Sequence, residues 1–356
     1  MVTLNAYSGL DRLVHRIAFA NSSVQIVAAE IEDILFRRDL KAVDVGGPIF
    51  ITSLPRAGTT ILLTALNSAP ALATHLYRDM PFVMAPLLWS RLSGRFRKQA
   101  MLQERAHGDG IAIGYDSPEA FEEVIWRAFW PGHFKPDGIA LWSANDAKSE
   151  ARDFMTRHFQ KIVALRCERG AGPGRYISKN NANIARLDLI PEMFPDAAVL
   201  VPVRSPLAHA ASLQRQHANF LERHAEDAFT LRYMGDIGHY EFGALHRPIQ
   251  FEGFAPLVEG FKVTDLDYWL AYWIAAFEHI AARRDRVHLI EYEDLCHRGR
   301  EAAADLCELL GIEESWASEI GAHFRPAPPT KPELEAFRSP LRDRAEAFHR
   351  ELISRL

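Results

Sequence analysis

One short segment near the N-terminus constrains the fold more than any other part of the chain. Residues 48–66 read PIFITSLPRAGTTILLTAL, an apolar run, then a turn, then a second apolar stretch that opens with two threonines. The first run predicts a strand over 49–53, and the second predicts a helix over 59–68 that Pro70 ends. A strand, a tight turn and a helix in succession form the building unit of a parallel α/β sheet.

The turn in this unit carries residue types that hold a small anion. The first N–H groups of a helix lack partners within the helix, and the helix dipole favours negative charge there. Gly58 lets the main chain approach a ligand, Arg56 supplies a guanidinium, and Thr59 and Thr60 supply hydroxyls. The nucleotide-triphosphate loop GxxxxGK[ST] is not matched, because Ser53 stands at its first glycine and Thr59 at its lysine.

Composition narrows the class of protein. The chain has 356 residues, of which 48% are apolar and 24% are charged, so one large α/β domain over 1–356 is expected. A formal net charge of -5 argues against a general nucleic-acid binder. Three cysteines without CxxC spacing favour a reducing compartment. Because no signal-peptide core and no bilayer-length apolar run is visible, we predict a cytoplasmic protein without a transmembrane segment.

Strands and helices alternate along the rest of the chain. Strands are predicted at 175–178, 198–203 and 287–291, and a long helix over 206–222 follows the second of them. Ser117 and Pro118 are typical of a helix start, which predicts a helix over 118–130. Within the single domain we expect N-terminal helices over 1–45, an irregular lid over 217–262 and a helical tail over 313–356.

A second anion-binding segment is expected at residues 198–213, which read AVLVPVRSPLAHAASL. Arg204 follows a buried strand, at the edge of a parallel sheet where ligands bind. Ser205 and Pro206 open the next helix, and Ser212 lies about a turn and a half into it. A guanidinium and a hydroxyl placed in this way suit a phosphate monoester.

Together the two segments resemble the sulfotransferase family, whose members use 3′-phosphoadenosine 5′-phosphosulfate (PAPS). LPRAGTT at 54–60 resembles the family's PRSGTT or PKSGTT loop, which holds the 5′-phosphosulfate. Arg204, Pro206 and Ser212 match the R-x-P sequence with a serine eight residues after the arginine, which holds the 3′-phosphate. Residues 179–197 and 292–312 resemble two further segments of the family.

The resemblance implies a fold, a co-substrate and a set of residues. The implied fold is a three-layer α/β structure with a parallel central sheet, flanking helices and a P-loop-like phosphosulfate loop. PAPS is the implied co-substrate, and the chemistry requires no metal. The residues implied to bind PAPS are Arg56, Ala57, Gly58, Thr59, Thr60, Arg204 and Ser212. Arg56 would neutralise charge on the leaving phosphate, and Lys179 is a candidate second cation near the sulfonate, with an exposed lysine at a strand end as the alternative.

Transfer to a hydroxyl also needs a general base. The segment THLYRDMPF, 74–82, follows the first strand–helix unit, so Asp79 is the first candidate and His75 the second. Glu123 and His133 are more distant alternatives. Aromatic residues of the lid, Tyr233, Tyr240, Phe242 and Phe251 among them, are candidates to line an acceptor pocket, with packing under a long loop as the alternative.

Several questions stay open at this point. The acceptor is a small molecule, a glycan or a lipid head group, and the oligomeric state, a homo-oligomer included, is not readable. The tail around Arg325 and Lys331 is a weak candidate for a further 3′-phosphate contact. The alternative functions are a P-loop kinase-like or NTPase-like phosphotransferase and a non-catalytic nucleotide-binding protein.

Overall fold

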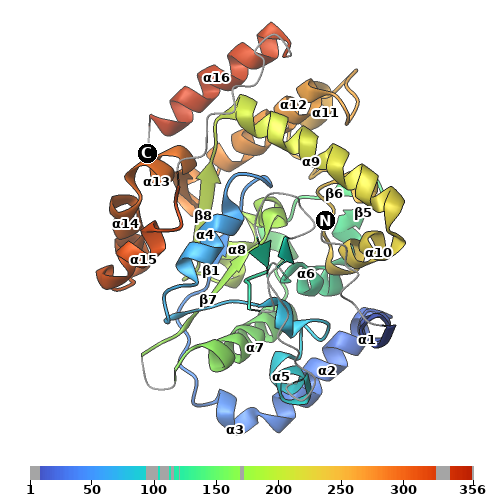
Figure 1. Ribbon diagram of the computed structural model, residues 1–356, viewed down its shortest axis with the longest axis vertical. Coiled ribbons are helices and arrows are strands. Elements are labelled where there is room, and N and C mark those ends of the chain that lie inside the picture. The colour runs from blue at the N-terminus through green and yellow to red at the C-terminus, as the bar shows by residue number, and fades with distance from the viewer. Residues whose placement is uncertain are drawn as a thin grey trace.

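The centre of the molecule is a five-stranded parallel sheet (Figure 1). The computed structural model describes residues 9–93, 103–104, 112–113, 116–119, 121–168, 172–325 and 337–354. The strands occur in the order β2 (Leu72–Ala73), β7 (Arg175–Lys179), β1 (Ile49–Ile51), β8 (Ala198–Val203) and β9 (His288–Glu291). The predicted parallel α/β architecture is therefore confirmed.

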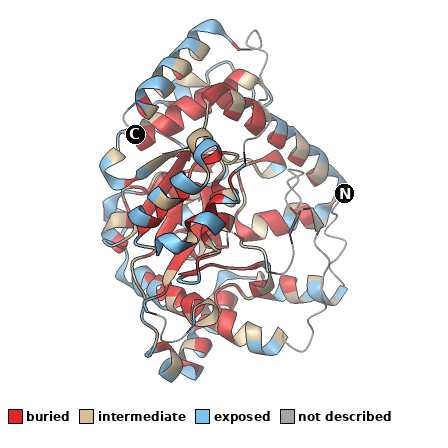
Figure 2. Cartoon of the chain, turned by 60° about the vertical axis from the view of Figure 1, so that its left-hand side comes forward, coloured by how far each residue is buried: buried red, intermediate tan, exposed pale blue. Residues whose placement is uncertain are grey.

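Helices pack on both faces of this sheet. In β1, Ile49 and Ile51 belong to a core on one face with α4 (Thr59–Leu66), α14 (Arg300–Leu310) and α15 (Ala317–Gly321). Phe50 points to the opposite face, where the core includes α7 (Ser149–Arg166), α9 (Pro206–Glu226) and α12 (Leu266–Ala281). Successive side chains of a strand point to opposite faces of the sheet, so an all-apolar strand is buried by helices on both faces. Figure 2 shows the buried residues concentrated in this central region.

The remaining elements surround this framework. The N-terminal helices are α1 (Gly9–Ala18), α2 (Ser22–Leu35) and α3 (Arg37–Leu40), and α5 (Pro86–Ser93) follows β2. The other helices are α6 (Glu123–Phe129), α8 (Ile190–Met193), α10 (Ala228–Ile237), α11 (Phe254–Leu257), α13 (Tyr292–Arg298) and α16 (Ser339–Ile353). Two small antiparallel pairs join β3 (Gln103–Glu104) to β4 (Ala112–Ile113) and β5 (Phe134–Lys135) to β6 (Gly138–Ile139).

Two predicted elements differ from the structure. Helix α6 begins at Glu123 instead of Pro118, because Pro118 forms an isolated antiparallel bridge with Leu76. The region expected to be irregular contains α10, whose first turn is capped by the side chain of Asp227 and whose end is a left-handed Gly238. Asp227 and Gly238 are ordinary signals for the start and the end of a helix. The high glycine and aromatic content of the surrounding segment obscured them in the sequence.

Candidate functional site

Three neighbouring strands place the residues of the site at one edge of the sheet. β7, β1 and β8 are adjacent and parallel, so the segments that follow them emerge at the same edge of the sheet. Lys179 ends β7, the turn over 52–58 follows β1, and Arg204 follows β8. Ligands of open parallel sheets bind beyond this carboxyl edge.

The turn after β1 has a backbone that only particular residues adopt easily. Gly58, the N-cap of α4, has φ 95°, and Arg56 has φ 74° although it is not glycine. A Cβ atom added to Gly58 would lie 2.2 Å from Cε2 of Tyr292. Gly58 is thus required both by its backbone angle and by the close packing of the Tyr292 ring. A strained non-glycine residue such as Arg56 persists only where its surroundings hold it.

The two predicted anion-binding segments contact each other directly. Nη1 of Arg204 donates a hydrogen bond to the carbonyl oxygen of Arg56 over 3.1 Å. Nε of Arg56 donates to the hydroxyl oxygen of Ser212 over 3.3 Å. The positive groups of both segments therefore lie on one side of the sheet edge and form one continuous patch.

A buried histidine supports this turn from below. His209 lies one turn into α9, and its Nε2 is 2.7 Å from the carbonyl oxygen of Pro55. Since a carbonyl only accepts, Nε2 carries the proton. Burial, aided by the nearby charges of Arg204 and Arg56, lowers the pKa of His209 to about 3, so the ring is neutral at pH 7.

A cavity of about 290 Å³ opens above the turn. Five of the predicted PAPS-binding residues line it, namely Arg56, Gly58, Thr59, Thr60 and Arg204. Ser212 is buried and reaches the site through its bond to Arg56, whereas Ala57 is fully buried and does not line the cavity. Lys179 and Tyr292 complete the wall near the turn.

The far wall of the cavity comes from the predicted lid region. Phe220 and His224 of α9, Met234 of α10, and Phe242 lie there. Tyr240 lines a smaller adjoining cavity, whereas Tyr233 and Phe251 line neither cavity. All four aromatic residues named from the sequence pack in the apolar core, and two of them, Tyr240 and Phe242, also line a cavity.

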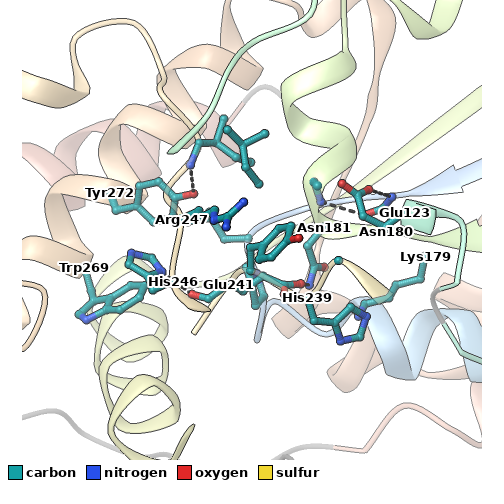
Figure 3. A pocket seen from close by; sticks show the side chains of 17 residues that line it. Glu123, Lys179, Asn180, Asn181, His239, Glu241, His246, Arg247, Trp269 and Tyr272 are labelled. Carbon is teal, nitrogen blue, oxygen red and sulfur yellow. Dashed lines mark hydrogen bonds between the residues drawn. The ribbon is translucent and has the colours of Figure 1, made fainter. Parts of the chain in front are cut away.

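The smaller cavity, of about 30 Å³, adjoins the larger one, and Figure 3 shows the residues that line it. Five residues line both cavities, namely Pro55, Lys179, Asn181, His239 and Glu241. Asn181 connects them to the turn: its side-chain oxygen accepts from the hydroxyl of Thr59 over 3.3 Å, and its Nδ2 donates to Glu241 over 3.2 Å. Sequence analysis missed Glu241 and His239, although both stand within the aromatic segment GHYEF, which the lid prediction included.

The two candidate bases chosen from the sequence lie elsewhere. Asp79 is buried, and its carboxylate binds Nη2 of Arg166 at 2.5 Å and Nδ1 of His75 at 3.2 Å. Burial by itself raises the pKa of Asp79, but the hydrogen bond from His75 and the charge of Arg166 outweigh it and lower the pKa. Nε2 of His75 contacts Nε2 of the buried His158 at 2.8 Å. Neither Asp79 nor His75 is among the residues that line the two cavities described above.

Glu123 and His133, the more distant candidates for the general base, also have structural partners. Glu123 lines the smaller cavity, but it is buried and forms an ion pair with Arg186 at 2.7 Å. His133 stacks on Trp142 with ring centroids 4.3 Å apart. In the tail, Arg325 is exposed and lines neither cavity, and Lys331 lies outside the described residues.

Comparisons with a family model and with solved structures both find sulfotransferases. The model of a family described as the sulfotransferase family matches residues 48–247, which is more than half of the chain. The structure is similar to sulfotransferase STF9 from Mycobacterium avium, with 15% identity, a TM-score of 0.54, and coverage of 98% of this chain and 87% of the other. Sulfotransferase STF1 from Mycobacterium tuberculosis also matches, with 15% identity, a TM-score of 0.49, and coverage of 96% and 87%.

A search of curated proteins finds no match. Within the described ranges, no helix has the length and apolar character to cross a membrane.

Proposed function

The chain belongs to the sulfotransferase family, and on this premise we propose that it transfers a sulfonate group from PAPS to a hydroxyl or amine of a small acceptor. One observation carries the choice of PAPS. The turn after β1 and the start of α9 form a single patch, in which Arg204 bonds the Arg56 carbonyl and Arg56 bonds Ser212. A donor with a 5′-phosphosulfate and a 3′-phosphate on one ribose has two anionic groups close enough together to engage such a patch.

Each residue has a role that its chemistry supports. The N–H groups at the start of α4, with Thr59 and Thr60, would hold the 5′-phosphosulfate. Arg204 and Ser212 would hold the 3′-phosphate, because a guanidinium fork matches phosphate oxygens. Arg56 and Lys179 would neutralise the charge that develops on the leaving phosphate.

The main contribution of the protein to the reaction is to position the donor and the acceptor. The acceptor oxygen attacks sulfur in line with the departing phosphate oxygen, and fixed geometry supplies most of the rate enhancement. The apolar wall of Phe220, Met234 and Phe242 supports an acceptor with an apolar body. Cys167, Cys296 and Cys307 are free thiols, which supports the reducing cytoplasm as the compartment.

A thermal-shift titration tests this proposal. The purified protein is heated with 3′-phosphoadenosine 5′-phosphate (PAP), with ATP or with AMP. A ligand at a hundredfold excess over its Kd stabilises the folded state by about 2.7 kcal/mol, so the preferred nucleotide gives the largest rise in Tm. We expect PAP to give it. Stabilisation by ATP alone would favour a phosphotransferase, and stabilisation by none of the three would contradict a nucleotide site here.

A further inference from the structure

We infer that Glu241 is the general base of this transfer, an inference that rests on the proposed function. Glu241 lines both the larger and the smaller cavity, and Figure 3 shows it among the residues of the smaller one. In the larger cavity it shares the lining with the apolar wall of Phe220, Met234 and Phe242 and with the phosphate-binding turn. A base must lie at this boundary, because it takes a proton from an acceptor oxygen that is approaching the sulfonate.

A short chain of hydrogen bonds fixes Glu241 relative to the turn. The hydroxyl of Thr59 donates to Oδ1 of Asn181, and Nδ2 of Asn181 donates to Oε1 of Glu241. Asn181 follows β7 and Thr59 begins α4, so both anchors belong to regular elements of the framework. The side-chain amide of Asn181 thereby orients the carboxylate of Glu241.

The other acidic side chain on these walls is not available. Among the described residues that line either cavity, only Glu123 and Glu241 carry a carboxylate. Both oxygens of Glu123 bind Arg186, and one also accepts from Asn180. In contrast, no arginine or lysine in the described part of the chain forms an ion pair with Glu241. The carboxylate of Glu123 is thus fully occupied by Arg186 and Asn180, which leaves Glu241 as the carboxylate positioned to accept a proton from the acceptor.

The histidines on the cavity walls also differ in how far their ring nitrogens are engaged in hydrogen bonds. His246 has both ring nitrogens engaged, Nδ1 with the carbonyl of Glu241 at 2.6 Å and Nε2 with the hydroxyl of Tyr268 at 3.0 Å. Nδ1 of His224 accepts the backbone N–H of Ala244 at 3.2 Å. His239, which lines both cavities, is the rival that an experiment must separate from Glu241.

The transfer step moves one proton and one sulfonate group. An oxygen of Glu241 accepts the proton of the acceptor O–H group while the acceptor oxygen forms a bond to sulfur. The bond between sulfur and the bridging phosphate oxygen breaks, and its electron pair leaves with PAP. Arg56 and Lys179 offset the added charge on PAP, and Glu241 later releases the proton to water.

The test compares E241Q, E241D and H239N. PAP binding is measured by calorimetry, and PAPS consumption is measured with a series of phenols of increasing acidity and with water alone as acceptor. We expect E241Q to bind PAP within about threefold of wild type and to lose about 10²- to 10⁴-fold in turnover of the least acidic phenol or of water. The loss should shrink as phenol acidity rises, because an ionised phenol needs no base. E241D should recover part of the rate.

Three outcomes would overturn the inference. One is an E241Q variant that turns over within about fivefold of wild type. Another is an E241Q loss that is equal for all phenols and accompanied by weaker PAP binding, which would assign Glu241 a structural role. The third is an H239N variant that alone abolishes the dependence on phenol acidity. A wild-type protein that neither binds PAP nor consumes PAPS would instead refute the proposed function itself.

Discussion

Nε of Arg56 lies 3.3 Å from the hydroxyl oxygen of Ser212, although the two residues are 156 positions apart in the sequence. Arg56 belongs to the turn after β1, and Ser212 belongs to the helix after β8. Because these strands are adjacent and parallel, a contact between the two segments follows from the order of the sheet. Arg56 therefore joins the two halves of the anion site, and changes on either side are expected to affect the same ligand.

Replacing Gly58 by alanine is expected to damage both stability and nucleotide binding. The residue has φ 95°, and an added Cβ would lie 2.2 Å from Cε2 of Tyr292. A non-glycine residue in this backbone region costs about 1–3 kcal/mol before any clash is counted. Urea unfolding should show a larger loss for G58A than for G260A, because Gly260 has φ 82° but open space around its Cα. Equal losses, with PAP affinity retained, would show that the Tyr292 contact is unimportant.

His209 is expected to hold the turn through its Nε2–H group. Leucine at this position removes the donor to the Pro55 carbonyl, and a buried carbonyl without a partner costs about 1–3 kcal/mol. Glutamine can still donate from a similar place. Calorimetry should therefore find PAP binding weakened in H209L and largely kept in H209Q. Equal PAP affinities in the two variants would contradict this role.

The same residue predicts a pH dependence of stability. The pKa of His209 is about 3 in the folded protein, against about 6.5 when unfolded, so between these values only the unfolded state binds the proton. Stability from the neutral ring is complete above pH 6.5 and is lost as the pH falls below it. Between pH 8 and pH 5, wild type should lose about 2 kcal/mol more of its unfolding free energy than H209Q loses. Parallel losses in urea titrations would refute the assignment.

Asp79 is expected to be a structural residue. Its carboxylate pairs with Arg166 and His75 in the interior, and breaking a buried ion pair by removing one charge costs about 3–5 kcal/mol. D79N should therefore lower the midpoint of urea unfolding while PAP affinity per folded molecule stays near that of wild type. The double variant D79N/R166M should recover part of the stability, since no charge is left unpaired. A D79N variant of normal stability that has lost turnover would restore Asp79 as a candidate base.

The sequence predicts the parts of the site that depend on local pattern. β8 is a continuous apolar run, and Ser205 and Pro206 mark the start of α9, so the position of Arg204 at the sheet edge follows directly. The turn at Gly58 is recognisable for the same reason, because glycine, threonine and an apolar helix stand in fixed order. These features require only the residues within one strand–helix unit.

The sequence does not reveal which polar residues are buried or paired over long distances. Asp79 does follow β2 at the expected edge, yet its partner Arg166 lies 87 residues away. Glu241 is held by Asn181 across 60 residues, and no local pattern marks that pair. The choice between Asp79 and Glu241 therefore depends on tertiary contacts, which separate a neutralised carboxylate from one that faces the cavities.

The most direct measurement of the two-segment anion site compares PAP with AMP, which lacks the 3′-phosphate, in wild type and in R204A. Hydrogen bonds to charged groups contribute about 1.5–3 kcal/mol each, so wild type should bind PAP about 10- to 150-fold more tightly than AMP. In R204A the preference for PAP should fall to within a few-fold, while AMP affinity changes little. A PAP-to-AMP ratio of Kd values that is the same in both proteins would contradict binding of the 3′-phosphate by Arg204.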